Sequence, residues 1–324
     1  MSLLQLRIGG RLYAGFGALL LFCMALAGFA VWQLSAIGDR VKETELQSRN
    51  AIRVSDIAAE LQAIRRAVLR YAFDQDEASF AESEKRLAAV SNLLADAERT
   101  TSSDERRAIY RELAKDVVEL KAKRAELGEA VAQMLAGRKL LFTDGDQMAA
   151  DVQKLVDAAQ GTPFEHAANA LETKVLLVRV ANWRMLATRD VQGVATFKTN
   201  LGKANEQLAA IEKSELPGSL AALLAPVKTG IAKYAAAFDK TGPNLVRGDE
   251  IYYKSITPII VGAVDRIEKV KTSISEKFES TIAETNGRVE TTITAQEVVA
   301  GAAVLLGLLI AFLIARGIIR PLAA

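Results

Sequence analysis

The amino-acid sequence predicts an all-α protein in which two transmembrane helices flank an elongated helical domain. Three observations lead to this fold class. The first proline of the 324-residue chain is Pro163, and so long a proline-free stretch suits long helices better than a turn-rich β fold. Two apolar runs, one near each end, carry no charged residue. Between them, apolar residues recur at steps of three and four, which is the period of a helix with one buried face.

Each apolar run is long enough to cross a bilayer as a helix. The first, 12–34, has 23 uncharged residues and would be about 35 Å long. The second, 298–315, has 18 uncharged residues and would be about 27 Å long, near the lower limit for a span. Trp32 lies at the outer end of the first run, where interfacial aromatic residues are common. We therefore place the transmembrane helices at 12–34 and 297–315.

Basic residues flank both runs and predict the orientation of the chain. Two arginines precede the first run and two follow the second, with no acidic residue in either flank: Arg7, Arg11, Arg316 and Arg320. By the positive-inside rule, residues 1–11 and 316–324 are expected in the cytoplasm and residues 35–296 on the other, extracytoplasmic side. The sequence thus predicts a two-pass membrane protein.

A cleaved signal peptide is the alternative interpretation of the first run. Ala25-Leu26-Ala27 resembles a cleavage site, and the preceding arginines suit the basic start of a signal peptide. The apolar run nevertheless continues to Leu34, which is long for the apolar part of such a peptide. An uncleaved anchor is therefore the favoured interpretation.

The composition argues against several classes of function. The 41 basic and 39 acidic residues nearly balance, which disfavours a nucleic-acid-binding protein. Cys23 is the only cysteine, so an intrachain disulfide and a cysteine-based zinc cluster are excluded. His166 is the only histidine, which disfavours a catalytic triad and a multi-histidine metal site. We expect no enzymatic activity, no metal and no cofactor.

Capping residues divide the domain between the spans into seven expected helices. Asp74–Glu77 ends one helix and begins the next, and Ser102–Glu105 has the spacing of a capping box. Pro163 follows Thr162 at a position that suits the first turn of a helix. The expected helices are 38–73, 76–99, 103–138, 145–160, 163–213, 219–240 and 248–296.

Turn residues predict where these helices are interrupted. Thr143–Asp146 is expected to form a turn, and Thr241–Asn244 is expected to close a helix, because both contain glycine and residues that favour turns. A break is expected near Gly193 or Gly202, and Pro258 should kink or restart the last helix.

The number of helices predicts two stacked four-helix bundles. The first helix continues from the first span and the last helix leads into the second span, so the two should run antiparallel beside each other. Each carries one apolar stripe, as an up-down bundle requires. The intervening helices are too numerous for one four-helix bundle of that height, and a second bundle on the distal end would use them.

The order of elements and two short motifs resemble those of bacterial methyl-accepting chemotaxis receptors. After the second span, Ile319-Arg320-Pro321-Leu322 resembles the opening of a HAMP linker, which relays signals below the membrane. Ala181-Asn182-Trp183-Arg184, within a long helical domain, resembles a stretch of the helical bimodular sensor family. The resemblance covers nearly the whole chain and lies more in its architecture than in its motifs.

The resemblance implies a homodimeric two-pass receptor of the bacterial inner membrane, whose periplasmic domain binds small organic acids. One ligand site is possible in each of its two stacked bundles. Signals would pass through the second span to HAMP and to a cytoplasmic signalling module that this sequence lacks. Two alternatives stay open: the same sensor on a histidine kinase or cyclase, and a membrane-tethered helical scaffold that binds protein.

Five polar residues are candidates for a ligand site in the membrane-proximal bundle. On the first helix, Arg65 lies about 80° from the centre of the apolar stripe, and Arg66 lies nearly opposite the stripe, where it could also reach a dimer partner. On the last helix, Lys271 is expected on the stripe itself, where an ammonium is costly unless paired or hydrated. Arg266 and Thr272 lie at a similar height. Ordinary ion pairs or solvated side chains are the alternative for all five.

Three residues of the Leu171–Gln192 stretch are candidates for a site in the second bundle. Asn182 and Arg189 are expected on the apolar stripe, and Arg179 flanks it. Two polar residues on a core face suggest an internal polar pocket. A buried hydrogen-bond network that fixes the helix register is an equally good interpretation.

Overall fold

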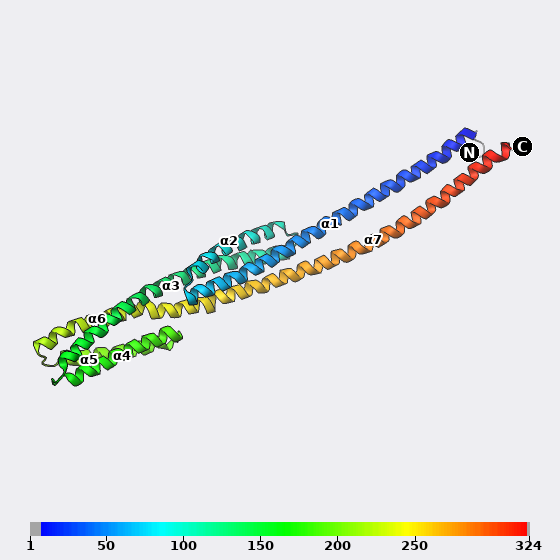
Figure 1. Ribbon diagram of the computed structural model, residues 1–324. Coiled ribbons are helices and arrows are strands. Elements are labelled where there is room, and N and C mark those ends of the chain that lie inside the picture. The colour runs from blue at the N-terminus through cyan, green and yellow to red at the C-terminus, as the bar shows by residue number, and fades with distance from the viewer. Residues whose placement is uncertain (1–7, 323–324) are drawn as a thin grey trace. The chain divides into compact units, whose positions relative to one another are not determined.

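The computed structural model describes residues 8–322, and every element within them is a helix (Figure 1). The prediction of an all-α protein is therefore confirmed. In chain order the elements are α1 (Ile8–Asp74), α2 (Glu77–Thr100), α3 (Asp104–Ala159), α4 (Glu165–Thr188), α5 (Gln192–Glu212), α6 (Gly218–Glu250), the π-helix η2 (Ile251–Ile256) and α7 (Thr257–Leu322). Residues 1–7 of the expected cytoplasmic N-terminus and residues 323–324 of the expected HAMP start lie outside this range.

Both apolar runs form parts of long helices. The first belongs to α1, which has 67 residues, and the second to α7, which has 66. Each contains a window with a mean hydropathy of at least 2.0 that is not buried inside the protein. By length and composition both helices can cross a membrane.

The chain divides into two compact units. One consists of the residues up to Ser55 together with those from Glu268 onward, and the other is Asp56–Ile267. In the Asp56–Ile267 unit, α3 packs along α6, α2 packs on α3, and α4 packs on both α5 and α3 (Figure 1). Leucine, isoleucine, valine and aromatic side chains from these helices fill the interior.

Two helix starts follow the predicted caps. The Asp76 carboxylate accepts hydrogen bonds from the amides of Ala78 and Ser79 at the start of α2. The Ser103 hydroxyl accepts one from the amide of Arg106 at the start of α3. These side chains satisfy N–H groups that have no partner within the first turn of a helix.

The turn expected at Thr143–Asp146 is wrong, because α3 continues through it to Ala159. Gly145 is buried, and a Cβ atom there would lie 2.8 Å from Cε2 of Tyr234 on α6. The glycine therefore allows α3 and a tyrosine of α6 to approach closely, and it does not form a turn.

The helix end expected at Thr241–Asn244 is also wrong, because α6 continues to Glu250 with Pro243 inside it. The irregularity falls later, in the π-helix Ile251–Ile256, whose wide turns are closed by the Thr257 amide donating to the Tyr252 carbonyl. Pro258 follows directly. A proline ring would collide with the carbonyl four residues earlier in an α-helix, and a wider turn relieves that collision.

Candidate functional site

A buried polar pair lies in the part of the protein where the second site was expected. Asn182 on α4 is fully buried, as predicted, and its Nδ2 donates to the hydroxyl of Tyr234 on α6 at 2.9 Å. Asn182 Oδ1 has no hydrogen-bond partner among the described residues. Burial raises the pKa of Tyr234 above its usual range, although the hydrogen bond from Asn182 opposes this. A buried amide oxygen without a partner is costly, and a ligand or a water molecule that donates a hydrogen bond to it would offset that cost.

Arg179 lies one turn before Asn182 on α4 and pairs with a residue of α3. Its Nη2 donates to Asp146 Oδ1 at 3.1 Å, with Asp146 mostly exposed. The charges of both residues act on Tyr234. The structure therefore brings Arg179 and Asn182 together around Tyr234, a residue that the sequence did not single out.

Arg189 does not occupy the helical position that was expected. α4 ends at Thr188, and Arg189 adopts the left-handed conformation with φ 55°, so the break between α4 and α5 precedes Gly193. Its guanidinium makes a bidentate pair with Asp249 of α6, with Nε donating to Oδ2 at 3.0 Å. It also lies over the ring of Phe73, 4.4 Å from the centroid. The residue therefore joins the ends of α4, α6 and α1.

Replacing Arg189 with alanine is expected to lower the free energy of unfolding by about 1–2 kcal/mol, because Asp249 loses a bidentate partner while both side chains are only one-fifth exposed. Chemical denaturation of the single variants Arg189→Ala and Asp249→Ala and of the double variant measures the coupling. The exposed pair Lys254–Glu250 provides the control, and Lys254→Ala should change stability by less than about 0.5 kcal/mol. Additive effects of the two main substitutions would show that the pair does not stabilise the junction.

The two proximal candidates on α1 carry guanidinium groups that have no partner among the described residues. Arg65 is half-buried and Arg66 is exposed. Neither makes a hydrogen bond or ion pair with another residue in the range 8–322. Arg65 is flanked by the buried Ile64 and Val68, so part of its side chain lies beside the core while the charge stays available.

Arg266, by contrast, is paired inside the protein. Its Nη1 donates to Asp116 Oδ2 of α3 at 2.6 Å. Burial raises the pKa of Asp116, and Arg266 acts in the opposite direction. The pair therefore offsets the cost of a half-buried carboxylate, which is the structural role that the sequence left open for Arg266.

The core position predicted for Lys271 is wrong. Its side chain is 55% exposed and lies 3.6 Å from Glu268 one turn earlier, while Val270 is fully buried between Ile267 and Ile274. Ile267 and Ile274 are seven residues apart, so either Val270 or Lys271 could face the core between them. Burying the valine avoids the cost of desolvating an ammonium group. Thr272 is exposed, and its hydroxyl donates to the Glu268 carbonyl.

The candidates are distributed over both units. Arg65, Arg66 and Arg266 belong to Asp56–Ile267, whereas Lys271 and Thr272 belong to the unit that contains the spans.

A buried arginine of α3 was not recognised from the sequence. Arg124 lies 3.8 Å above the ring of Phe80, donates to Ser83 Oγ and Glu84 at 2.6 Å each, and donates to the Phe80 carbonyl at 2.7 Å. Burial lowers the pKa of Arg124. These three hydrogen bonds and the ring contact all go to α2, so Arg124 fastens α2 to α3.

No three histidine, cysteine, aspartate or glutamate residues between positions 8 and 322 are grouped so as to hold a metal ion. Comparison with models of known protein families gives no match to this sequence, and comparison with curated protein sequences gives none either.

Proposed function

We propose that the protein is the sensory and membrane portion of a two-pass bacterial receptor for small organic acids. The observation that carries this proposal is the continuity of α1 and α7, each of which joins an apolar span to the helical domain without interruption. A continuous helix transmits a small displacement of one end to the other. A ligand would shift the position of α7 by binding one position more tightly than the other.

The ligand class follows from the available cations. Arg65 is half-buried beside the core, and its guanidinium has no partner among the described residues. A guanidinium of this kind can bind a carboxylate through charge-assisted hydrogen bonds. Small mono-, di- or tricarboxylates therefore fit the proposal, as they fit the resemblance to helical bimodular receptors. Two stacked four-helix bundles, homodimerisation, a periplasmic domain and a HAMP linker that begins after the second span belong to the same proposal.

A thermal-shift screen of the full chain in detergent tests the proposal. Acetate, succinate and citrate represent the three carboxylate classes. A ligand present at 100 times its dissociation constant should stabilise the protein by about 2.7 kcal/mol. If no member of a broad carboxylate panel changes the melting temperature, the proposed ligand class is wrong.

Both ends of the chain are expected in the cytoplasm. Reporter tags at Ser2 and Ala324 should both be cytoplasmic, and residues 35–296 should be cleaved by a protease added from outside, because the arginines flank the spans on one side. Tags on opposite sides, or a mature chain that begins near Gly28, would contradict a two-pass anchor.

A helical scaffold that binds protein is the second candidate. It is favoured by the fact that Arg179, Arg189 and Arg266 each have a carboxylate partner within the protein. Such a protein should show no carboxylate-dependent melting. A chemotaxis receptor and a sensor kinase or cyclase share the sensing proposal and differ in the cytoplasmic output.

A further inference from the structure

A polar recess lies between α1 and α7 in the unit that contains the spans. It has a cavity volume of about 220 Å³ and is lined by Trp32, Gln33, Ala36, Ile37, Arg40, Thr285, Arg288, Thr291 and Thr292. Both charged residues of this lining are arginines, and no carboxylate lines it. The charged groups that line the recess are therefore both cationic, while Glu43 and Glu284 approach Arg40 from outside the lining.

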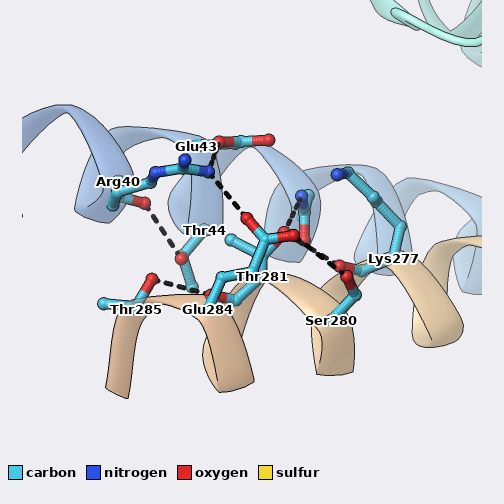
Figure 2. Close-up of polar contacts among 9 residues, drawn as sticks. Arg40, Glu43, Thr44, Lys277, Ser280, Thr281, Glu284 and Thr285 are labelled. Carbon is cyan, nitrogen blue, oxygen red and sulfur yellow. Dashed lines mark hydrogen bonds and ion pairs between the residues drawn. The ribbon is translucent and has the colours of Figure 1, made fainter. Parts of the chain in front are cut away.

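The two guanidinium groups of the recess have free binding capacity. Arg288 is exposed and makes no hydrogen bond or ion pair within the described part of the chain. Arg40 reaches between Glu43 and Glu284, at 3.4 and 3.3 Å (Figure 2). These distances exceed the roughly 2.7–2.9 Å of a strong charge-assisted hydrogen bond. An anion in the recess can therefore compete for Arg40.

The hydrogen bonds of the other polar groups around the recess determine which donors are available to a ligand. The hydroxyls of Thr285, Thr291 and Thr292 donate to the Thr281 carbonyl, the Gly287 carbonyl and Gln33 Oε1, respectively. The Gln33 side-chain NH₂ makes no hydrogen bond with a described residue. The donors available to an anion are thus two guanidiniums and one amide.

The recess lies at the outer boundary of the expected spans. Trp32 and Gln33 are the third- and second-last residues of the first apolar run, and Gln33 is hydrogen-bonded to Thr292 at 2.9 Å, which places the two helices in register there. Arginine side chains one to two turns farther out can extend along the helices toward the headgroup layer. Tryptophan is typical of the same layer.

A groove on the surface of α7 continues from the recess toward the second span and becomes apolar at its far end. It has a volume of about 590 Å³ and is lined by Glu290, Thr291, Thr294, Ala295, Val298 and Val299. Thr291 lines both hollows, and Val298 is the first residue of the second apolar run. Two arginines above a groove that ends on Ala295, Val298 and Val299 match a molecule with an anionic head and a hydrocarbon tail.

We propose that the recess between Arg40 and Arg288 binds the phosphate group of an anionic phospholipid whose acyl chain lies along the groove that begins at Thr291. This inference rests on the membrane embedding of the proposed function. Glu284 and Glu290 lie beside the site and disfavour headgroups with additional negative charge. A lipid bound in this place would contact both α1 and α7 where these helices enter the membrane.

Trp32 is a built-in reporter of the site. In the full chain carrying Trp183→Phe, Trp32 is the remaining tryptophan. The protein is reconstituted into phosphatidylcholine nanodiscs that contain equal mole fractions of either brominated phosphatidylglycerol or brominated phosphatidylcholine. Quenching of Trp32 by the brominated acyl chains reports which lipid is next to it. Two arginines should enrich the anionic lipid on the order of tenfold to thirtyfold.

Matched variants separate the site from general surface charge. Arg40→Gln/Arg288→Gln should abolish the preference for brominated phosphatidylglycerol. Arg49→Gln, on the same helix and paired with Glu45, should preserve it. Equal quenching by the two lipids, or a preference that survives the double substitution, would overturn the proposal.

Added inorganic phosphate distinguishes a lipid from a soluble anion. If millimolar inorganic phosphate removes the preference, the recess binds free phosphate and the lipid proposal is wrong; an unchanged preference supports the lipid. Carboxylate-dependent melting of the same nanodiscs reports the sensing function separately, so either proposal can fail without the other.

Discussion

Replacing Gly137 with alanine is expected to destabilise the protein by about 2–3 kcal/mol, toward the upper end of what overpacking costs. A Cβ atom at this buried position of α3 would lie 2.4 Å from Thr241 Oγ1 and 2.8 Å from the Ala237 carbonyl oxygen, both on α6. The carbonyl belongs to the backbone and cannot rotate away. Separating α3 from α6 would weaken an extensive helix contact of the Asp56–Ile267 unit.

Gly202→Ala is the matched control for this prediction, because Gly202 lies inside α5 and a Cβ atom there meets nothing within 4 Å. Alanine has a higher helix propensity than glycine, so this variant should be stabilised by about 0.5–1 kcal/mol. Urea denaturation followed by circular dichroism measures both variants. Stabilisation by both substitutions would contradict the close α3–α6 packing at Gly137.

Replacing Arg65 with alanine is expected to weaken the binding of a stabilising carboxylate by about 10- to 150-fold. A charge-assisted hydrogen bond contributes roughly 1.5–3 kcal/mol, and 1.4 kcal/mol corresponds to a factor of ten in affinity. Since Arg65 has no partner within the described residues, its removal strands no acidic group. The melting temperature without ligand should therefore change little. Calorimetric titration of the full chain with the carboxylate found in the screen gives the affinity.

Arg49→Ala removes the same charge from the same helix and should leave carboxylate affinity unchanged, since Arg49 is exposed and pairs with Glu45.

Lys271→Met should leave the stability of the protein without ligand nearly unchanged, because the lysine side chain is exposed. If Arg65→Ala binds the carboxylate as tightly as the unsubstituted protein, the site is elsewhere, and Asn182 with its orphaned Oδ1 becomes the next residue to substitute.

Features that depend on neighbouring residues were predictable from the sequence. The caps at Asp76 and Ser103 act on amides two or three residues away, so their spacing is visible in the chain. The apolar runs in α1 and α7 were visible for the same reason. The turn expected near Gly145 failed because that glycine accommodates Tyr234, 89 positions away, and a local pattern contains no information about such a contact.

The prediction of the candidate sites was limited for the same reason, because the sequence does not show which distant residues meet in the fold. Arg266 and Asp116 are 150 positions apart, and nothing beside either residue indicates that they pair. The burial of Asn182 followed from the helical period of α4, whereas its partner Tyr234 did not. The prediction for Lys271 was wrong because the helical period allows either of two neighbouring residues to face the core. The structure buries Val270 and leaves Lys271 exposed.

The proposed displacement of α7 relative to α1 is the central claim, and disulfide formation between these helices measures it. Gln47 on α1 and Thr281 on α7 are in buried contact, with Nε2 donating to Oγ1 at 3.1 Å. The rate at which cysteines at these two positions cross-link, in a chain with Cys23 replaced by alanine, therefore reports the separation of the two helices. A carboxylate that raises the melting temperature should change the rate of cross-linking in the full chain, and should no longer do so after Arg65→Ala. An identical rate with and without a saturating carboxylate that demonstrably binds would contradict signalling through α7.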